Sequence, residues 1–383
     1  MAEKKAKKNT VQKKKQSPAK NTETRGKLKC AVVGLGIGQM HVDQYQHCPD
    51  AELVAICDID PVRLHAVGDK FHVDKRYESI TEMLAAEKPD VVSIAVPNHL
   101  HKPLTIEALE AGCHVLCEKP MAMNAEEAEE MVKTAKRMKK RLMIDFSYRT
   151  SEQSVALKKA VDGGALGNIY YARTQWLRRR GAPSGAGCWF SQKKLAGGGP
   201  LLDLGVHRLD LALWLMGYPK PLWVLGSTYD HLAKQIDDAA YDPVANKMVR
   251  NSGRIYDVED FAVALVKFEN GATLELEASW LANIKERELM TTRLLGTKGG
   301  LLQKNVNETY SFEAEIFTEM NGCQYDMKLH PPVPAAHSHM YNFVEAIVHG
   351  TQHDATGEQG LLVMRILDAI YKSAETGDPV FIQ

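Results

Sequence analysis

The feature that most constrains the fold is an alternation of short apolar runs with helical stretches between Leu28 and Arg149. The apolar runs are Cys30–Val33, Leu53–Ile56, Val91–Val96, Val115–Leu116 and Leu142–Ile144. Strands buried on both faces of a sheet have such continuous apolar runs, and parallel strands require a crossover connection, usually a helix. The stretch from Asn124 to Lys140 has an N-cap residue, apolar positions at helical spacing and a basic last turn. The alternation predicts a Rossmann-type α/β domain over residues 27–148.

The pattern changes in the rest of the chain, where strand-like segments become dominant. The clearest are Ile169–Leu177, Phe261–Phe268, Ala272–Trp280 and Leu289–Leu295. Residues 269–271 read Glu-Asn-Gly between two of these segments, which is a hairpin turn signal. Amphipathic helices are expected at Ser338–Val348 and Gly357–Glu375. We predict a C-terminal α+β domain over residues 149–383 with a large, mainly antiparallel open sheet. Within it, residues 230–256 are either a functional loop or a local insertion.

The net charge of the 383-residue chain is zero, but the charge is unevenly distributed. The first twenty residues contain eight lysines and one glutamate, a net charge of +7, which leaves −7 for the remainder. Residues 1–26 also contain almost no apolar side chains, so they are predicted to be a disordered basic tail. The acidic remainder argues against a nucleic-acid-binding protein.

Membrane and secretory signals are not expected in this chain. No apolar run approaches the roughly 18 residues that suggest a membrane-spanning helix, and the lysine-rich start is not followed by the apolar segment of a secretory signal. We therefore expect a cytoplasmic protein. The seven cysteines are odd in number and mostly lie in apolar surroundings, which predicts buried free thiols. Cys113 and Cys117 have no second Cys or His pair at zinc-site spacing, so no metal is expected.

A glycine-rich loop directly follows the first apolar run. In this loop Gly34, Gly36 and Gly38 alternate with apolar residues, among them Ile37, and a helical stretch follows. In dinucleotide-binding folds, glycines at this point allow a tight turn and let backbone N–H groups approach a pyrophosphate. Gln39 stands where the third glycine of G-x-G-x-x-G is usual, so the loop is expected to be one residue shorter. Alone, such a loop is equally compatible with a plain turn.

An acidic residue at the end of the second apolar run favours the cofactor site over the plain turn. Asp58 lies 20 residues beyond Gly38, where an acidic side chain accepts hydrogen bonds from the adenosine ribose hydroxyls. A carboxylate there also repels a 2′-phosphate, so NAD is expected in preference to NADP. Arg63 lies close in sequence and weakens this preference. A solvated turn residue is the alternative interpretation of Asp58.

Two polar clusters follow the next strands of the predicted parallel sheet. Pro97, Asn98 and His101 come after the Val91–Val96 run, and Glu118 and Lys119 come after the run that begins at Val115. In open parallel sheets, ligands bind outside the carboxyl ends of the strands. We therefore assign both clusters to the mouth of the cofactor site.

A third polar cluster lies in the predicted C-terminal domain. A run of three glycines at 197–199 leads into a segment that contains Asp203, His207 and Asp210. On a helix these three residues have i, i+4 and i+7 spacing and therefore share one face. We expect all three side chains to point into a single cleft.

In combination, these motifs resemble the glucose-fructose oxidoreductase / inositol dehydrogenase / MocA-like (Gfo/Idh/MocA) oxidoreductase family. The matching features are the glycine loop closing on His41, Val96-Pro97-Asn98 with His101, Glu118-Lys119-Pro120, and Gly197-Gly198-Gly199 followed by Asp203 and His207. They extend over nearly all of residues 28–383. The short glycine loop and the basic tail depart from the family's pattern.

The resemblance implies an NAD(P)-dependent enzyme that oxidises a secondary hydroxyl of a sugar, glycoside or cyclitol by hydride transfer to nicotinamide. Ring C3 of a sugar is one candidate position. Lys119, Asp203 and His207 match the family's catalytic positions. An imidazole that titrates near neutral pH suits the role of base, here His207, and the Lys119 cation stabilises the reacting oxygen. Asp203 would orient either group or bind an adjacent hydroxyl.

Further residues are weaker candidates for lining the cofactor or substrate cleft. They are Asn98, His101, Arg149, Trp189 and His339. Arg149 and Trp189 are expected to contact substrate together with Asp203 and His207. Trp189, beside a glycine-rich segment, has simple packing as its alternative. The catalytic candidates also have ordinary structural alternatives: a surface lysine at a strand end for Lys119, a satisfied helix histidine for His207 and a helix N-terminal acid for Asp203.

Two other functions remain open at this point. One is an NAD-dependent glycosidase that works by transient oxidation and elimination of the aglycone. The other is a non-enzymatic sensor of a sugar or of NAD, which would not require a proton-transfer apparatus. The expected partner is a small-molecule sugar, glycoside or cyclitol, with no nucleic acid and no membrane. The resemblance also implies a homo-dimer or tetramer, and an exposed antiparallel sheet would suit self-association.

Overall fold

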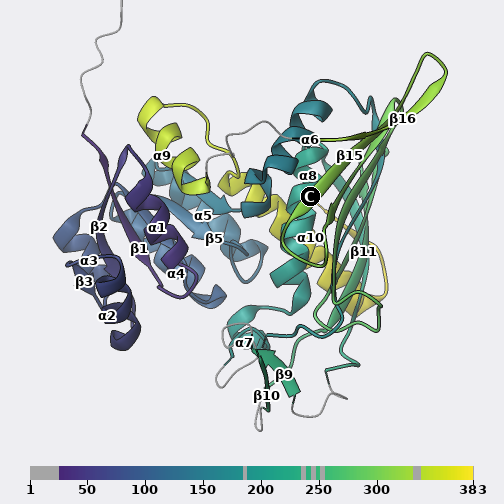
Figure 1. The fold of residues 1–383 in the computed structure, drawn as a ribbon. Helices are drawn as coiled ribbons and strands as arrows, with labels where there is room; N and C mark the ends of the chain where they lie inside the picture. Colours follow the sequence, from purple (N-terminus) through teal and green to yellow (C-terminus); the bar gives the residue numbers. More distant parts are fainter. Residues whose placement is uncertain are drawn as a thin grey trace, which may run out of the picture.

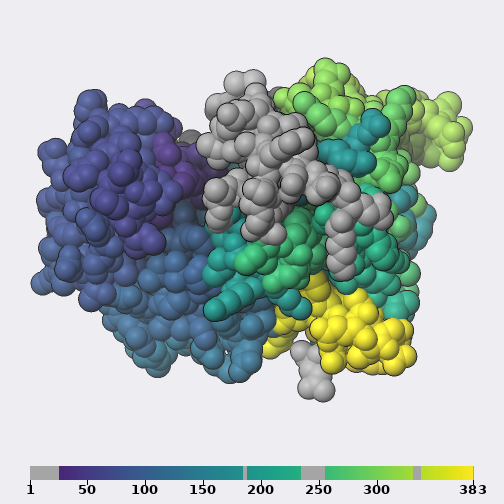
Figure 2. Space-filling model, turned by 90° about the horizontal axis from the view of Figure 1, so that it is seen from below, coloured from purple at the N-terminus to yellow at the C-terminus, as the bar shows by residue number. Residues whose placement is uncertain are grey.

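The computed structural model describes residues 26–183, 188–233, 239–242, 247–250, 255–330 and 338–382. The predicted basic tail lies outside these residues except for Gly26. Two sheet-containing units lie side by side (Figure 1). Viewed from below, residues 26–150 form one lobe, coloured purple to blue, and the green and yellow residues visible in this view lie in the other (Figure 2).

The first unit is built on a six-stranded sheet, sheet A, with strand order β3-β2-β1-β4-β5-β6 and parallel pairing throughout. Its strands are β1 (Leu28–Val33), β2 (Ala51–Cys57), β3 (Arg76–Tyr77), β4 (Val91–Ile94), β5 (His114–Glu118) and β6 (Leu142–Asp145). Its helices are α1 (Gln39–His47), α2 (Pro61–Lys70), α3 (Ile80–Glu87), α4 (His101–Glu110) and α5 (Ala125–Met138), with short 3-10 turns at Asn98–Leu100 and Ser147–Thr150. The strand order reverses between β1 and β4, the point where open α/β sheets bind ligands at the carboxyl ends of their strands.

The second unit is built on a nine-stranded sheet, sheet B, with strand order β16-β15-β14-β13-β7-β12-β11-β8-β17. Its strands are β7 (Ile169–Arg178), β8 (Pro221–Tyr229), β11 (Phe261–Phe268), β12 (Thr273–Ser279), β13 (Glu288–Gly296), β14 (Gly299–Asn305), β15 (Phe312–Met320), β16 (Cys323–Lys328) and β17 (Val380–Phe381). Neighbouring strands are antiparallel except β7 and β12. The two sheets confirm the predicted fold class.

Helices cover one face of sheet B (Figure 1). They include α6 (Glu152–Asp162), α8 (Val206–Leu215) and α10 (Gly357–Thr376), while α7 (Lys193–Ala196) and a π-helical turn at Leu201–Gly205 precede α8. Inward residues of the strands alternate with outward ones, and the inward residues are buried against these helices. The chain then returns to the first unit, because α9 (His339–His349) lies against α1.

Local signals in the sequence account for several boundaries. The Asn124 side chain accepts a hydrogen bond from the Glu127 N–H and caps α5, as expected. The Glu-Asn-Gly segment forms the predicted hairpin between β11 and β12, with Gly271 at a φ of +87°. Within residues 230–256, β9 (Ala239–Asp242) and β10 (Lys247–Arg250) pair as a separate two-stranded sheet, which favours a local insertion. In the described parts of the chain, no helix has the length and apolar character needed to cross a membrane.

Candidate active site

A cavity of about 980 Å³ lies where the carboxyl ends of β4, β5 and β6 face the second unit. Its lining includes the predicted site residues Ile37, Asn98, Glu118, Lys119, Trp189, Asp203 and His207. Trp189 stacks on Phe190, with ring centroids 3.9 Å apart. Asn98 also joins the two units, because its side-chain amide donates a hydrogen bond to the Ala196 carbonyl oxygen at 2.8 Å. The structure thus brings together residues from distant parts of the sequence at the sheet edge where ligands are expected.

The glycine loop beside this cavity fits a dinucleotide. Gly34 has a φ of +86°, and a Cβ atom there would lie 2.3 Å from the Ala95 carbonyl oxygen. A Cβ at Gly38 would lie 2.0 Å from the Gly34 carbonyl oxygen, so both positions require glycine. Gly36 faces open space, because a Cβ atom there would have no neighbour within 4 Å, and this leaves room for a phosphate group to approach the backbone. Ile37 is 54% exposed and lines the cavity.

Asp58 ties the glycine loop to the end of β2. Its carboxylate accepts hydrogen bonds from the Leu35 N–H at 2.7 Å and from the Asp60 N–H at 2.9 Å. Arg63 donates to both carboxylate oxygens, at 2.8 and 3.0 Å. Burial acts to raise the pKa of Asp58, but the hydrogen bonds from Arg63 and the backbone lower it overall. Asp58 is therefore ionised and paired, and its contact with a ribose stays a prediction.

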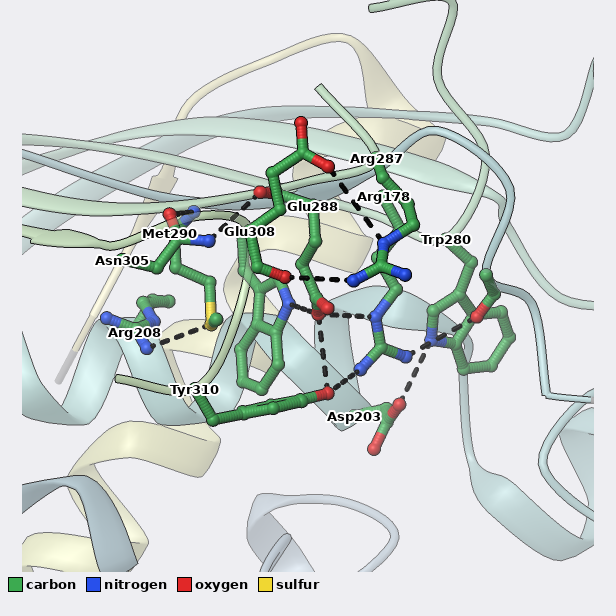
Figure 3. Close-up of polar contacts among 12 residues, drawn as sticks. Arg178, Asp203, Arg208, Trp280, Arg287, Glu288, Met290, Asn305, Glu308 and Tyr310 are labelled. Atoms are coloured by element: carbon green, nitrogen blue, oxygen red, sulfur yellow. Dashed lines mark hydrogen bonds and ion pairs between the residues drawn. The ribbon is translucent and has the colours of Figure 1, made fainter. Parts of the chain in front are cut away.

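Lys119 and Asp203 form an ion pair across the two units. Lys119 Nζ lies 2.9 Å from Asp203 Oδ1 and 2.9 Å from the Asp203 carbonyl oxygen. The second carboxylate oxygen of Asp203 accepts a hydrogen bond from Trp280 Nε1 at 3.0 Å (Figure 3). Burial would raise the pKa of Asp203, but the charges of Lys119 and Arg178 lower it. The lysine ammonium is thereby fixed at the cavity wall, as a group that stabilises a reacting oxygen must be.

His207 is a buried imidazole beside this ion pair. Its ring lies edge-on to Tyr148, with centroids 4.9 Å apart, and Nδ1 has no hydrogen-bond partner among the described residues. Burial, followed by the positive charges of Lys119 and Arg208, holds the pKa of His207 well below its usual range. His207 is therefore neutral near pH 7 and can accept a proton.

Two aromatic residues of the cavity lining, Tyr148 and Trp176, form an aromatic wall, and Arg208 lies behind it. Its guanidinium carbon lies 4.4 Å from the ring centroid of Tyr148 and 5.2 Å from that of Trp176. Its Nη2 lies 3.5 Å from Met290 Sδ (Figure 3). These contacts hold the rings that pack around His207.

A polar network that the sequence analysis did not predict extends this wall (Figure 3). Glu288 Oε1 accepts hydrogen bonds from Trp176 Nε1 at 2.7 Å and from Arg178 Nε at 2.8 Å. Arg178 also donates to the Tyr310 hydroxyl at 2.8 Å. These residues come from β7, β13 and the turn before β15, so only the pairing of strands brings them together.

A second titratable cluster lines the cofactor side of the cavity. His41 Nε2 lies 3.1 Å from Glu118 Oε1 and 3.4 Å from Asp145 Oδ2. Burial acts to lower the pKa of His41, but its hydrogen bonds to Asp145 and Glu118 raise it to about 9. Asp145 Oδ1 also lies 2.6 Å from His339 Nδ1. The ligand atoms of His41, Glu118 and Asp145 all lie within 4.8 Å of one another, a spacing that can hold a metal ion, but an imidazolium already joins the two carboxylates.

Four further residues that were expected at the cofactor or substrate cleft do not line this cavity. Arg149 is fully buried and does not line the cavity, because its guanidinium group donates to both carboxylate oxygens of Asp210, at 2.6 and 2.8 Å. The expectation that Asp210 shares a cleft with Asp203 and His207 is therefore wrong, since this buried ion pair turns it inward. His101 is 1% exposed, and its ring nitrogens contact the carbonyl oxygens of Val96 and Pro120 at 2.8 and 2.7 Å. His101 therefore contacts the backbone behind the cofactor side of the cavity and is not part of the described lining. Pro97 is not part of it either.

The fold defines an NAD-binding oxidoreductase with a second unit built on a mainly antiparallel sheet. The model of an oxidoreductase family with an NAD-binding Rossmann fold matches residues 28–146, and the GFO/IDH/MocA C-terminal domain model matches residues 154–302. The chain belongs to the Gfo/Idh/MocA family.

Named relatives cover almost the whole chain. D-glucoside 3-dehydrogenase of Escherichia coli (strain K12) is 35% identical over 94% of this chain and 99% of its own length. Myo-inositol 2-dehydrogenase of Thermotoga maritima is 25% identical, over 91% of this chain and 96% of its own. Among solved structures, the aldose-aldose oxidoreductase from Caulobacter crescentus complexed with glycerol has a TM-score of 0.77 and 26% identity, covering 93% of this chain and all of that one.

Proposed function

We propose that this enzyme oxidises a secondary hydroxyl of a sugar, glycoside or cyclitol by hydride transfer to nicotinamide. The observation that carries the proposal is the cavity at the edge of sheet A, where the Lys119–Asp203 ion pair lies beside the neutral His207. The names of the relatives, a glucoside dehydrogenase and an inositol dehydrogenase, support the same substrate class. The similarity over 99% of the E. coli enzyme favours a glucoside and ring C3 within that class.

Each side chain has a defined task in this reaction. Bound NAD supplies the hydride acceptor. His207 takes the proton of the substrate hydroxyl as the carbon loses hydride, a role that requires a neutral imidazole. The Lys119 ammonium donates a hydrogen bond to the same oxygen and stabilises its developing negative charge. Asp203 accepts a hydrogen bond from the ammonium and holds it in place.

The expected assembly and location remain part of the proposal. Exposed apolar side chains on the uncovered face of sheet B, at Leu225 of β8 and Leu265 of β11, support self-association as a homo-dimer or tetramer. All seven cysteines are thiols, as in a protein of the cytoplasm.

The test is a substrate panel with the wild-type enzyme. The protein is incubated with NAD and with sugars, methyl glycosides and cyclitols, while absorbance at about 340 nm and products by mass are followed. NADH formation with one class and the matching keto product support the proposal. Release of an aglycone without net NADH would indicate the glycosidase alternative instead, and NAD binding without any product would indicate a sensor.

Cofactor preference tests the role of Asp58. Wild-type protein is expected to bind NAD at least tenfold more tightly than NADP, as measured by titration calorimetry. Asp58→Ala is expected to lower that ratio at least tenfold, roughly 1.4 kcal/mol, because it removes a buried carboxylate and frees the Arg63 guanidinium for a 2′-phosphate. The Asp58→Ala/Arg63→Ala variant is the control and should not gain NADP affinity. An unchanged ratio in the single variant would remove Asp58 from the ribose site.

A further inference from the structure

His339 has a ring nitrogen that lacks a partner at the cavity. The residue begins α9 and is 2% exposed, and it lines the same cavity as Lys119 and His207. Its Nδ1 contacts Asp145, whereas Nε2 is buried without a hydrogen-bond partner among the described residues. A buried polar atom without a partner costs free energy, because it has lost its hydrogen bonds to water. A group that enters the cavity and hydrogen-bonds Nε2 would remove this cost.

Asp145 determines which nitrogen remains available. Burial would raise the pKa of Asp145, but His339 and His41 lower it well below its usual range, so the side chain is a carboxylate. A carboxylate only accepts hydrogen bonds, so His339 must donate through Nδ1–H. The other ring nitrogen, Nε2, is then an acceptor in the neutral imidazole and a donor in the protonated one. His41 contacts the other oxygen of Asp145, which holds the carboxylate against rotation.

The position of this pair favours the substrate over the adenosine part of the cofactor. Asp145 ends β6, at the opposite side of the strand-order reversal from Asp58, which directly follows β2. In doubly wound sheets the two halves of the dinucleotide lie on the two sides of that reversal. Asp145 is also close enough to His207 for its charge to act on that imidazole. Nε2 of His339 therefore belongs to the half of the cavity that contains the proposed base.

We propose that His339 is a specificity residue whose Nε2 hydrogen-bonds a substrate hydroxyl other than the reacting one, with Asp145 as its positioning residue. The inference rests on the proposed function and extends it. A hydroxyl both donates and accepts, so it matches the ring nitrogen in either protonation state. The site thus selects a polyol in which a second hydroxyl has a fixed position relative to the oxidised one. An analogue without that hydroxyl leaves Nε2 unpaired and is disfavoured.

The experiment combines an enzyme variant with deoxy substrates. His339→Asn keeps an amide nitrogen near the position of Nδ1, so it can still donate to Asp145, but it lacks Nε2. His349→Asn is the matched control, because His349 is exposed on the same helix and is not part of the described lining. kcat/KM is measured for the best substrate of the panel and for each of its monodeoxy analogues that keeps the reacting hydroxyl.

The expected result is a paired loss. With the full substrate, kcat/KM of His339→Asn should be about 10- to 100-fold lower than that of wild type. With wild type, kcat/KM for one deoxy analogue should be lower than that for the full substrate by a similar factor. For that analogue, kcat/KM of His339→Asn should be less than threefold below that of wild type. For the other analogues, His339→Asn should lose the same factor as it does with the full substrate, and His349→Asn should match wild type with every substrate. NADH affinity of His339→Asn should stay within twofold of wild type.

Three results would overturn the inference. One is a His339→Asn variant that still discriminates against every deoxy analogue as wild type does. Another is a fall in NADH affinity as large as the fall in kcat/KM, which would assign Nε2 to the cofactor. The third result is measured on wild type and does not depend on the folding of a variant. It is a kcat/KM for every such deoxy analogue that lies within threefold of the value for the full substrate. Absence of NADH formation with any sugar or cyclitol would instead contradict the proposed function itself.

Discussion

Replacing His207 by alanine is expected to lower kcat about 100-fold or more while NAD binds with wild-type affinity. General-base catalysis by a positioned side chain contributes about 10²- to 10⁴-fold, and alanine cannot accept the hydroxyl proton. His207 lies on the second-unit side of the cavity, so its removal should leave the glycine loop intact. kcat is measured with saturating substrate, and NAD affinity by calorimetry. His349→Ala, a surface change, is the control and should behave as wild type.

The pH dependence gives a second measurement of the same assignment. Protonation of His207 removes the base, so the rate falls as the pH drops through its pKa. Because burial and the nearby cations lower this pKa well below 6.5, the acid limb of kcat/KM should lie below pH 6.5 in wild type and be absent from His207→Ala. Near-normal turnover by His207→Ala, or the same acid limb in both proteins, would assign the proton transfer to another group.

Features that lie close together in the sequence could be predicted, because their geometry is local. Gly34 and Gly38 lie in a tight turn directly after a strand, and a Cβ atom at either position would collide with a backbone carbonyl oxygen. The strand-end position of Lys119 followed from the parallel sheet, which gathers its carboxyl ends at one edge. The alternation of apolar runs predicted sheet A for the same reason.

Contacts between distant residues could not be predicted in this way. Trp280 and Asp203 are 77 residues apart, and Glu288 and Trp176 are 112 residues apart. No local pattern gives the register that pairs β7 with β13. His41 and Asp145 likewise meet only because α1 and β6 converge on one edge of sheet A. A single chain contains no signal for such pairs beyond the polar identity of each residue.

Arg149 shows how nearness in sequence can mislead. It follows β6 closely in the sequence and was expected to contact substrate in the cleft. Its neighbours Tyr148 and Thr150 do line the cavity, but the guanidinium group turns inward to Asp210, 61 residues away. The buried carboxylate determines the direction of the side chain, because an unpaired buried charge would be far more costly than a lost contact at the surface.

Arg149→Met is therefore expected to reduce the free energy of unfolding by about 3–5 kcal/mol, the cost of leaving one partner of a buried ion pair uncompensated. Both side chains of the Arg149–Asp210 pair are at most 1% exposed, and Arg149 also donates to Asp354 at 2.7 Å. Thermal and urea unfolding followed by circular dichroism measure the loss. Arg137→Met is the matched control: its 2.6 Å pair with Glu110 is more than half exposed on the arginine side, so a change below about 1 kcal/mol is expected.

A double variant separates the buried charge from the lost packing. Arg149→Met/Asp210→Leu removes both charges and should recover part of the stability, because a buried ion pair can be replaced by apolar side chains at little cost whereas one unpaired member cannot. The folded fraction of Arg149→Met should keep the wild-type KM, since the guanidinium group does not line the cavity. A wild-type melting temperature together with a raised KM would return Arg149 to the substrate-binding role that its sequence position suggested, and would mean that Asp210 finds its partner elsewhere.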